Sequence, residues 1–219
     1  MRSEYADYFN HDEDAEGYDL EVTQEDDPIR TGYASMVAWI GGRVGSKARV
    51  LDLGSGTGNT ILALPPGCNV TAVDISIRMT EIAKGKLRDR KVTFVLNDIL
   101  QYVDSAPIHQ FDFIVSSYAL HHLTPDERER LFSRALAGTT ADVHIVIGDL
   151  MYKNDSDRKR IIRKHRRTRP DLATIMEDEF FWNIELTNEV FARLGWEASW
   201  KGFSDLSWTV ELARARRER

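Results

Sequence analysis

The chain alternates between short apolar runs and amphipathic segments. Apolar runs that lack polar alternation are typical of strands buried on both faces of a sheet. Such runs occur at 48–53, 69–74, 91–98, 110–117 and 141–149. Because helical segments separate them, they predict right-handed crossovers and a mostly parallel sheet.

Apolar spacing and end signals predict the helices between these runs. Helices are expected over 30–45, 59–64, 76–89, 124–138, 154–168 and 184–195. Ser76 and Thr124 have side chains that can cap helix N-termini. Gly195 can end the last helix, and the pair Gly41 and Gly42 is expected to end the first.

Two late strands, at 196–203 and 207–215, follow the alternating part. A connection of about four residues cannot make a parallel crossover, so this pair must be at least partly antiparallel. The pattern therefore predicts an α/β fold with a doubly wound, mostly parallel sheet, helices on both faces and a hairpin at one edge. In such sheets a ligand binds beyond the carboxyl ends of the strands, where the strand order reverses.

Length, cysteine content and hydropathy bound the class of protein. The 219 residues are expected to form a single domain. The one cysteine, Cys68, excludes an intramolecular disulfide and suits a reducing, cytoplasmic location. The chain begins without an apolar signal region and holds no run of about 18 apolar residues, so neither secretion nor a membrane span is expected.

Charge is unevenly placed, although the net charge of −6 is mild. Residues 4–27 hold eleven acids and no base, whereas 153–169 hold nine Lys or Arg against two acids, and the tail 214–219 is basic. These runs are either solvated faces or segments that meet each other or a substrate. The net acidity argues against a globally basic nucleic-acid binder.

A glycine-rich turn, in RVLDLGSGTGNT, joins the first strand to the next helix. Gly54 permits the sharp turn, and Gly56 and Gly58 remove side chains so that a ligand can touch backbone amides. Asp74 ends the following strand, where a carboxylate can accept both hydroxyls of a ribose. This combination predicts a nucleoside site.

The glycine spacing separates two kinds of nucleoside ligand. It is G-x-G-x-G, and Asn59 stands where the dinucleotide pattern G-x-G-x-x-G needs its last glycine. Asp52 lies two residues before the first glycine, where its carboxylate would repel a pyrophosphate but suit an ammonium or a sulfonium. The pattern therefore argues against a nicotinamide dehydrogenase.

Four motifs in order resemble the class I S-adenosylmethionine-dependent methyltransferase family. They are VLDLGSGTGNT, VTAVDIS with Met79 after it, LNDIL and FDFIVSSYALHHL, and the resemblance extends over about Tyr18 to Ala213. It implies a Rossmann-like, seven-stranded sheet whose last strand is antiparallel, with S-adenosylmethionine as the cofactor. Small bacterial members of the family are the most similar.

The resemblance also implies which residues hold the cofactor. They are Tyr18, Asp52, Gly54, Gly56, Gly58, Asp74, Ile75, Met79, Asp98, Ile99 and Ser116. The three glycines and the backbone of Ser116 would contact the methionine portion, with Asp52 near its amino group. Asp74 would bind the ribose and Asp98 the adenine amino group, while Tyr18 would close the site from the N-terminal side.

The same resemblance places Tyr118 and His121 opposite the transferred methyl group. Methyl transfer depends mainly on positioning and on exclusion of water. A hydroxyl, phenol or amine acceptor would gain from a general base, for which His121 is the candidate, whereas a thiolate or carboxylate needs none. Because adjacent side chains point different ways, at most one of His121 and His122 is expected in the cavity. Packing or helix capping is the other role open to each.

No metal site is expected, because no two histidines have the helical i, i+4 spacing and Cys68 stands alone. Residues 1–45 are expected to form N-terminal cap helices, and 151–182 a lid-like insertion over the acceptor. In that insertion Phe180, Phe181 and Trp182 would line an aromatic cavity or anchor the next helix.

The expected function is methyl transfer to a small-molecule acceptor, with nucleic acid and membrane disfavoured as partners and a homodimer left open. An RNA methyltransferase, with the basic run on phosphates, is one alternative. A non-catalytic cofactor-binding protein on the same fold is another. The sequence does not identify the acceptor or the atom that is methylated.

Overall fold

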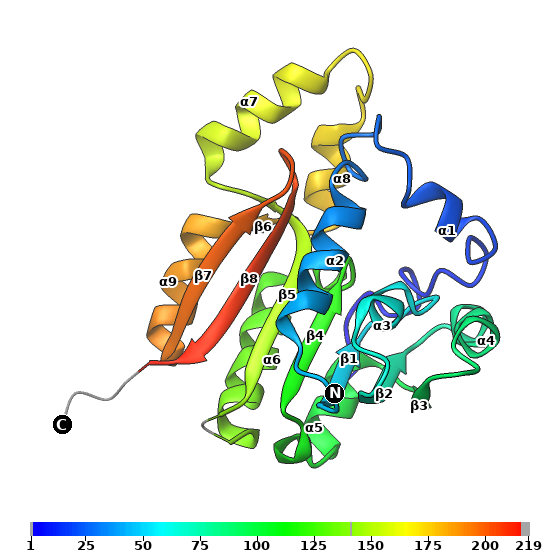
Figure 1. Ribbon diagram of the computed structural model, residues 1–219. Coiled ribbons are helices and arrows are strands. Elements are labelled where there is room, and N and C mark those ends of the chain that lie inside the picture. The colour runs from blue at the N-terminus through cyan, green and yellow to red at the C-terminus, as the bar shows by residue number, and fades with distance from the viewer. Residues whose placement is uncertain (1, 141, 216–219) are drawn as a thin grey trace.

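The computed structural model describes residues 2–140 and 142–215, so the end of the basic tail, 216–219, lies outside the described residues. Its centre is an eight-stranded sheet in the order β3-β2-β1-β4-β5-β8-β7, with β6 paired to β5 beside this path (Figure 1). The strands are β1 Arg49–Leu53, β2 Asn69–Asp74, β3 Lys91–Leu96, β4 Phe113–Ser117, β5 His144–Tyr152, β6 Trp182–Asn183, β7 Trp196–Gly202 and β8 Ser207–Arg214.

Helices connect the strands and extend from both ends of the sheet. The α-helices are α1 Tyr18–Glu21, α2 Tyr33–Arg43, α3 Asn59–Ala63, α4 Ile77–Lys86, α5 Ile99–Ser105, α6 Pro125–Gly138, α7 Asp155–His165, α8 Leu172–Asp178 and α9 Ile184–Leu194. Two short 3-10 helices, η1 Ile108–Gln110 and η2 Leu120–His122, lie on either side of β4. No helix in the described ranges is long and apolar enough to cross a membrane.

The predicted sheet is confirmed. Strands β1 to β5 pair in parallel, and β8 is antiparallel to both β5 and β7. The seven expected strands are present, and the two-residue β6 adds an eighth beside β5. Because the order reverses between β1 and β4, the carboxyl ends of these two strands form the expected crevice.

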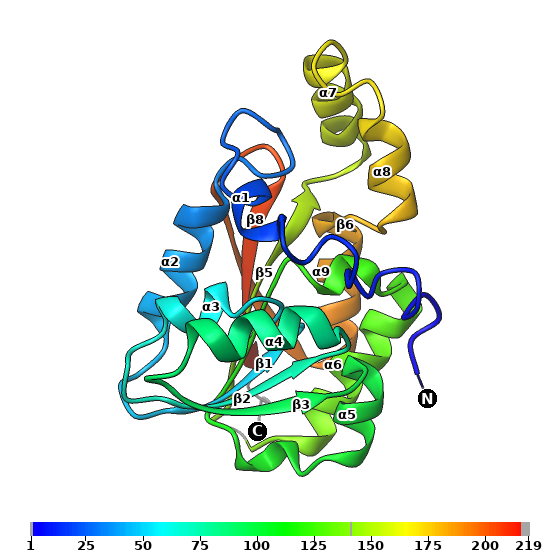
Figure 2. The same ribbon diagram turned by 90° about the vertical axis from the view of Figure 1, so that its right-hand side faces the viewer.

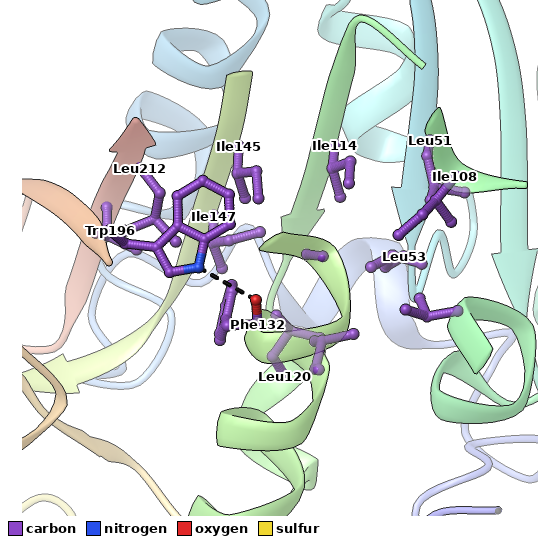
Figure 3. Close-up of a cluster of buried hydrophobic side chains, with 14 of the residues drawn as sticks. Leu51, Leu53, Ile108, Ile114, Leu120, Phe132, Ile145, Ile147, Trp196 and Leu212 are labelled. Carbon is purple, nitrogen blue, oxygen red and sulfur yellow. Dashed lines mark hydrogen bonds between the residues drawn. The ribbon is translucent and has the colours of Figure 1, made fainter. Parts of the chain in front are cut away.

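Two layers of helices bury the two faces of the sheet (Figures 1 and 2). Helices α5, α6 and α9 pack on one face, and α2, α3 and α4 on the other. In the first layer the indole of Trp196 donates a hydrogen bond to the carbonyl of Phe132 at 3.2 Å (Figure 3). This bond satisfies a buried polar group within an otherwise apolar cluster.

Most of the predicted helix ends are confirmed. The Ser76 hydroxyl accepts the Met79 N–H at 2.9 Å, and Thr124 forms a reciprocal capping box with Glu127. Gly195 takes a left-handed conformation, φ 92°, after α9.

The expectation that Gly41 and Gly42 end a helix is wrong, because α2 continues to Arg43. The reason for glycine at 41 is a close contact between helices. A Cβ on Gly41 would lie 2.2 Å from the carbonyl oxygen of Ala63, at the end of α3.

The two oppositely charged runs meet at one ion pair, between Arg169 and Asp27. Most of the other ion pairs join each run to residues outside the other run. On α7, Arg160, Lys164 and His165 all contact Asp205, in the turn between β7 and β8. The acidic segment instead lies along α3 and α4, where its acids pair with Arg78 and Lys86.

Candidate functional site

A cavity lies at the carboxyl edge of the sheet, and its empty space, together with the open solvent at its mouth, is about 1040 Å³. The segments that follow β1, β2, β3 and β4 form its floor. Residues of the N-terminal segment between Ser3 and Tyr33 line it from above, and Glu179 lines it from the end of α8. The cavity therefore occupies the place expected for a ligand of a doubly wound sheet.

The three glycines after β1 have different tasks. All have positive φ, at 70° for Gly54, 49° for Gly56 and 85° for Gly58. A Cβ on Gly54 would lie 2.3 Å from the Cβ of Ala119, and one on Gly58 would lie 2.7 Å from Cδ1 of Leu87. A Cβ on Gly56 would meet no atom within 4 Å, so its open side faces the cavity. Gly54 also lines the cavity, whereas Gly58 does not and instead lets α3 pack on α4.

Asp74 is held in the cavity wall by backbone hydrogen bonds. Its Oδ2 accepts the Gly56 N–H at 2.6 Å, and its Oδ1 accepts the Ser76 N–H at 2.8 Å. Burial raises the pKa of its carboxyl group, against the pull of these bonds. Each oxygen keeps a further lone pair for a hydroxyl donor from a ligand.

Asp52 is buried in β1 without a hydrogen-bond partner. Its residue exposure is 0%, and neither carboxylate oxygen has a partner among the described residues. Burial, with a smaller contribution from Asp74, raises its pKa to about 8. It lies behind the cavity wall rather than in the lining. A buried carboxylate of this kind is stabilised by a nearby positive charge, which a cationic ligand would bring.

After β3, Asp98 caps α5 and contacts the N-terminal segment. Its Oδ1 accepts the Gln101 N–H at 3.0 Å, and the Ser3 hydroxyl donates to its Oδ2. Ile75, Met79 and Ile99 line the cavity beside it. These apolar side chains and one carboxylate form a subsite that suits a flat heterocycle with an amino group.

Ser116 does not line the cavity, because its side chain turns into the sheet and donates to the Leu53 carbonyl at 2.6 Å. The next residue, Ser117, lines it instead, with its hydroxyl 2.6 Å from that of Thr60. Tyr18 lines the cavity from α1, as expected. Its neighbour Asp19 anchors α1 by accepting hydrogen bonds from the glycine loop and from α4. The donors are Thr57 at 2.6 Å, Asn59 at 3.0 Å and Lys86 at 2.7 Å.

Tyr118 lines the cavity, but its hydroxyl is bound inside the protein. It donates to the Ile29 carbonyl at 2.8 Å and lies 2.6 Å from the Ser207 hydroxyl. Burial raises the pKa of the phenol. The backbone at Tyr118 has φ 48°, a strained value for a bulky residue that tertiary contacts must hold. The phenol therefore fixes the wall and is not free to take a proton.

His121 is buried between two acids. Its Nδ1 lies 2.5 Å from Oδ1 of Asp149, and its Nε2 lies 3.8 Å from Oε2 of Glu179. Burial lowers the pKa of the imidazole, and the charges of Arg30, His11 and Arg128 lower it further. A neutral imidazole that lines a cavity can accept a proton there.

Both adjacent histidines line the cavity, so the expectation of at most one is wrong. They lie in the 3-10 helix η2, where successive side chains turn by about a third of a circle rather than to opposite sides. His122 Nε2 lies 3.1 Å from Nε2 of His11, and its ring stacks on Phe9 at a centroid distance of 4.2 Å. His122 therefore holds the N-terminal segment over the cavity.

Several lining or supporting residues were not predicted from the sequence. Arg30 is the only Lys or Arg among the described lining residues, and it pairs with Glu21. No motif marks Arg30, Glu179 or the N-terminal segment. Asp149 had a signal, because a lone acid in the apolar strand IVIGDLM resembles Asp52 in RVLDL.

The aromatic residues after α8 do not line the cavity. Phe181 and Trp182 are buried in the core, at 4% and 0% exposure. Trp182 packs with Phe191 of α9, whereas Phe181 packs with Leu172 and Met176 of α8. Among the described residues, no three His, Cys, Asp or Glu side chains are grouped as metal ligands.

Comparison with known sequences identifies the family. The family model described as "Methyltransferase domain" matches residues 50–141. An uncharacterized methyltransferase of Bacillus pumilus is 32% identical over 220 residues, covering 98% of this chain and 99% of the relative. One of Geobacillus kaustophilus is 29% identical over 219 residues, with the same coverage of 98% and 99%.

Solved structures share the fold. The DhpI-SAM-HEP complex has a TM-score of 0.68 at 20% identity, over 94% of this chain and 95% of the other. Magnesium protoporphyrin IX methyltransferase of Synechocystis, with bound SAH, has a TM-score of 0.62 at 19% identity, over 96% and 97%. The solved structures thus share the fold, and the sequence relatives show that the chain belongs to the methyltransferase family.

Proposed function

We propose that this methyltransferase acts on a small-molecule acceptor bound at the His121 end of the cavity. The observation that carries the proposal is one continuous cavity that joins the Asp74 and Asp98 subsites to His121 and is covered by the N-terminal segment. The contacts that hold this cover include Ser3 with Asp98 and His11 with His122. A partly covered cavity at this place suits a cofactor with a small partner better than a polymer.

The lining residues fit S-adenosylmethionine, which supplies an activated methyl group when it is bound. Asp74 would accept the ribose hydroxyls, and Asp98 the adenine amino group, from the positions described above. The unpaired carboxylate of Asp52 would gain a counter-charge from the ligand's ammonium group. Arg30 would bind the ligand's carboxylate, since its guanidinium has five N–H donors and one hydrogen bond, to Glu21, in the described structure.

His121 is proposed to accept a proton from the acceptor. Its Nδ1 faces Asp149, which leaves Nε2 directed to the cavity side, near Glu179. The ring of Tyr118 fixes the adjoining wall, and the N-terminal segment keeps water away. Such positioning and exclusion are the main contributions that a protein makes to this kind of transfer.

An RNA acceptor is the second candidate, because α7 is basic and stands away from the sheet (Figure 2). Three of its basic side chains already pair with Asp205, and Arg169 after it pairs with Asp27. These pairs leave fewer cations for phosphates.

We also propose a cytoplasmic location, which the buried free thiol of Cys68 supports.

A labelling experiment separates the two acceptors. The purified protein is incubated with methyl-labelled cofactor and, in separate reactions, with a small-metabolite extract and with total RNA. Label in a small molecule supports the proposal. Label in RNA alone would overturn it, and binding of the cofactor without label in either pool would favour a non-catalytic role.

A further inference from the structure

We infer that Glu179 and His121 together form the proton-accepting pair of the acceptor subsite, so that the acceptor is a small molecule with an O–H or N–H nucleophile. The inference rests on the proposed function and names the class of substrate that the same site takes. It gives Glu179 a catalytic role and Asp149 a positioning role.

The first observation is an imidazole between two carboxyl groups. Asp149 Oδ1 lies 2.5 Å from Nδ1 of His121 and also accepts the Leu150 N–H at 2.8 Å, which fixes this side of the ring. On the other side, Oε2 of Glu179 is 3.8 Å from Nε2. Glu179 lines the cavity, and its carboxylate makes no hydrogen bond to another described residue, although its backbone N–H donates to the Ile175 carbonyl at 3.0 Å. An N–H or O–H donor placed beside Nε2 would also reach Glu179.

A second observation is that one buried guanidinium fixes both turns that carry this pair. Arg128 donates to the carbonyls of Leu120 and Leu123, at 3.3 and 2.7 Å, around the η2 turn of His121. It also donates to the carbonyl of Phe180 at 2.8 Å, in the turn after Glu179. Two elements far apart in the sequence are thereby held in one geometry, as a catalytic pair requires.

The backbone of the second turn supports the same conclusion. Phe180 has φ 48°, which costs a bulky residue free energy and persists only where surrounding contacts hold it. The ring of Phe180 packs against Tyr5 of the N-terminal segment, with centroids 5.4 Å apart. The strained residue therefore follows Glu179 directly and contacts the cover of the cavity.

The surroundings of the pair move the two pKa values in opposite directions, so that His121 is a neutral imidazole at neutral pH while Glu179 titrates there. Burial raises the pKa of Glu179 to about 7, opposed by Arg30 and Arg169 and assisted by Asp149 and Glu21. Burial lowers the pKa of His121, as do Arg30, His11 and Arg128. The other titratable neighbours are His122 and Tyr118, whose ring centroids are 4.0 and 6.2 Å from that of His121.

This arrangement selects among acceptors. S-adenosylmethionine would supply the methyl group and would leave as S-adenosylhomocysteine. The O–H or N–H bond of the acceptor would break with its electron pair staying on the nucleophile, which bonds the methyl carbon, and its proton would pass to Nε2 of His121 or to Oε2 of Glu179. A carboxylate acceptor has no proton to give, and Glu179 and Asp149 would repel its charge. A thiolate is disfavoured for the same two reasons.

Histidine NMR tests the pair without a known acceptor. The probe is the ¹⁵N signal of His121 in protein saturated with S-adenosylhomocysteine, assigned with a His121→Asn variant and followed between about pH 5 and pH 9. The variants are Glu179→Gln and the control Glu177→Gln, which removes an exposed acid from the same helix. We expect a step in the Nε2 shift near the pKa of Glu179 in the native protein and in the control, and its loss in Glu179→Gln.

An Asp149→Asn variant completes the set and should alter the Nδ1 signal while retaining the Nε2 step. Identical Nε2 curves for Glu179→Gln and the native protein would overturn the inference. So would a methyl ester or a methyl thioether as the product of the labelling experiment, although the proposed function would stand. Failure to bind S-adenosylhomocysteine would count against the proposed function instead.

Discussion

Gly41 and Ala63 lie so close that no side chain fits at position 41. A Cβ there would be 2.2 Å from the Ala63 carbonyl oxygen and 2.7 Å from its carbon. The contact sets the distance between α2, which begins at the cavity-lining Tyr33, and α3, which follows the glycine loop. A backbone contact outside the cavity thus determines the spacing of two of its walls.

Gly41→Ala should therefore destabilise the protein by about 1–3 kcal/mol or more, because the new methyl group overlaps backbone atoms that cannot move aside. The neighbouring Gly42 is a matched control, since a Cβ there meets nothing within 4 Å. Gly42→Ala should be stabilising by about 0.5–1 kcal/mol, as for other glycines inside helices. Urea unfolding of both variants measures this, and equal stabilities would contradict the close contact.

Asp74→Ala should weaken S-adenosylmethionine binding by about 2–4 kcal/mol, because charge-assisted hydrogen bonds are lost from a partly buried site. Calorimetric titration measures the affinity. Asp112→Ala is the control, since Asp112 pairs with Arg49 at the opposite end of β1. Unchanged affinity in Asp74→Ala would remove Asp74 from the cofactor site.

Asp52→Asn should stabilise the protein without cofactor at high pH and weaken cofactor binding. The folded-state pKa of Asp52, about 8, lies above its ordinary value of 3.8. The stability contributed by this group is therefore complete below pH 3.8 and is lost as the pH rises through about 8. An amide has no such titration, so the gain at pH 9 should be about 1–3 kcal/mol.

Thermal unfolding at pH 6 and pH 9, with and without S-adenosylmethionine, checks this behaviour. The cofactor should stabilise the native protein more at pH 9 than at pH 6, because the permanent positive charge of its sulfonium is attracted to the ionised Asp52. The Asn variant should lose that difference. A variant that is less stable than the native protein at pH 9 would show that Asp52 has an unseen partner.

His121→Asn should lower turnover by about 10²–10⁴-fold if His121 is the general base, with little change in cofactor affinity. Because the pKa of His121 lies below 6.5, the imidazole stays neutral at neutral pH. Activity should fall only when the pH drops below that ordinary range, and this acid limb should be absent from the variant. His109→Asn, in η1 on the protein surface, is the control. Equal turnover in both variants would leave His121 a structural role.

The contact between the acidic and basic runs should be sensitive to salt. Arg169 and Asp27 link the N-terminal segment to the insertion after β5, so we expect cofactor to slow amide exchange in both segments. In an Arg169→Gln variant the free energy of unfolding should fall by about 1 kcal/mol or less, as for other partly exposed ion pairs. Exchange measured at low and high salt tests the link, since the Debye length falls from about 30 Å at 0.01 M to 3 Å at 1 M. If the amide exchange rates of both segments change with neither cofactor nor salt, the two charged runs are simply solvated faces.

The sheet could be predicted because its evidence is local. An apolar run such as RVLDL has one stable place, between two layers of helices, and the glycines after it require positive φ. The caps at Ser76 and Thr124 follow the same logic. Gly41 was misread because its reason is a contact with Ala63, which no local pattern contains.

The two ends of the cavity differ in how much the sequence predicted. Asp74 ends β2 and Asp98 lies just beyond the end of β3, so their positions come with the topology. Arg30 and Glu179 reach the cavity through the N-terminal segment and the insertion, whose paths depend on tertiary contacts such as Arg128 with Phe180. Whether Asp74 and Asp98 bind the cofactor as the resemblance implies stays a prediction.

The short strand β6 has a consequence for how such a protein could change its substrate. Met151 pairs with Trp182 and Tyr152 with Asn183, so the segment that carries Glu179 leaves the sheet and returns to it at one point. The pairing of β5 with β6 already joins the two ends of this segment. Because the ends of the segment 153–181 are adjacent, a related chain could carry a different segment at this point. Such a replacement would change the wall of the acceptor subsite and would leave the central sheet and the cofactor half of the cavity in place.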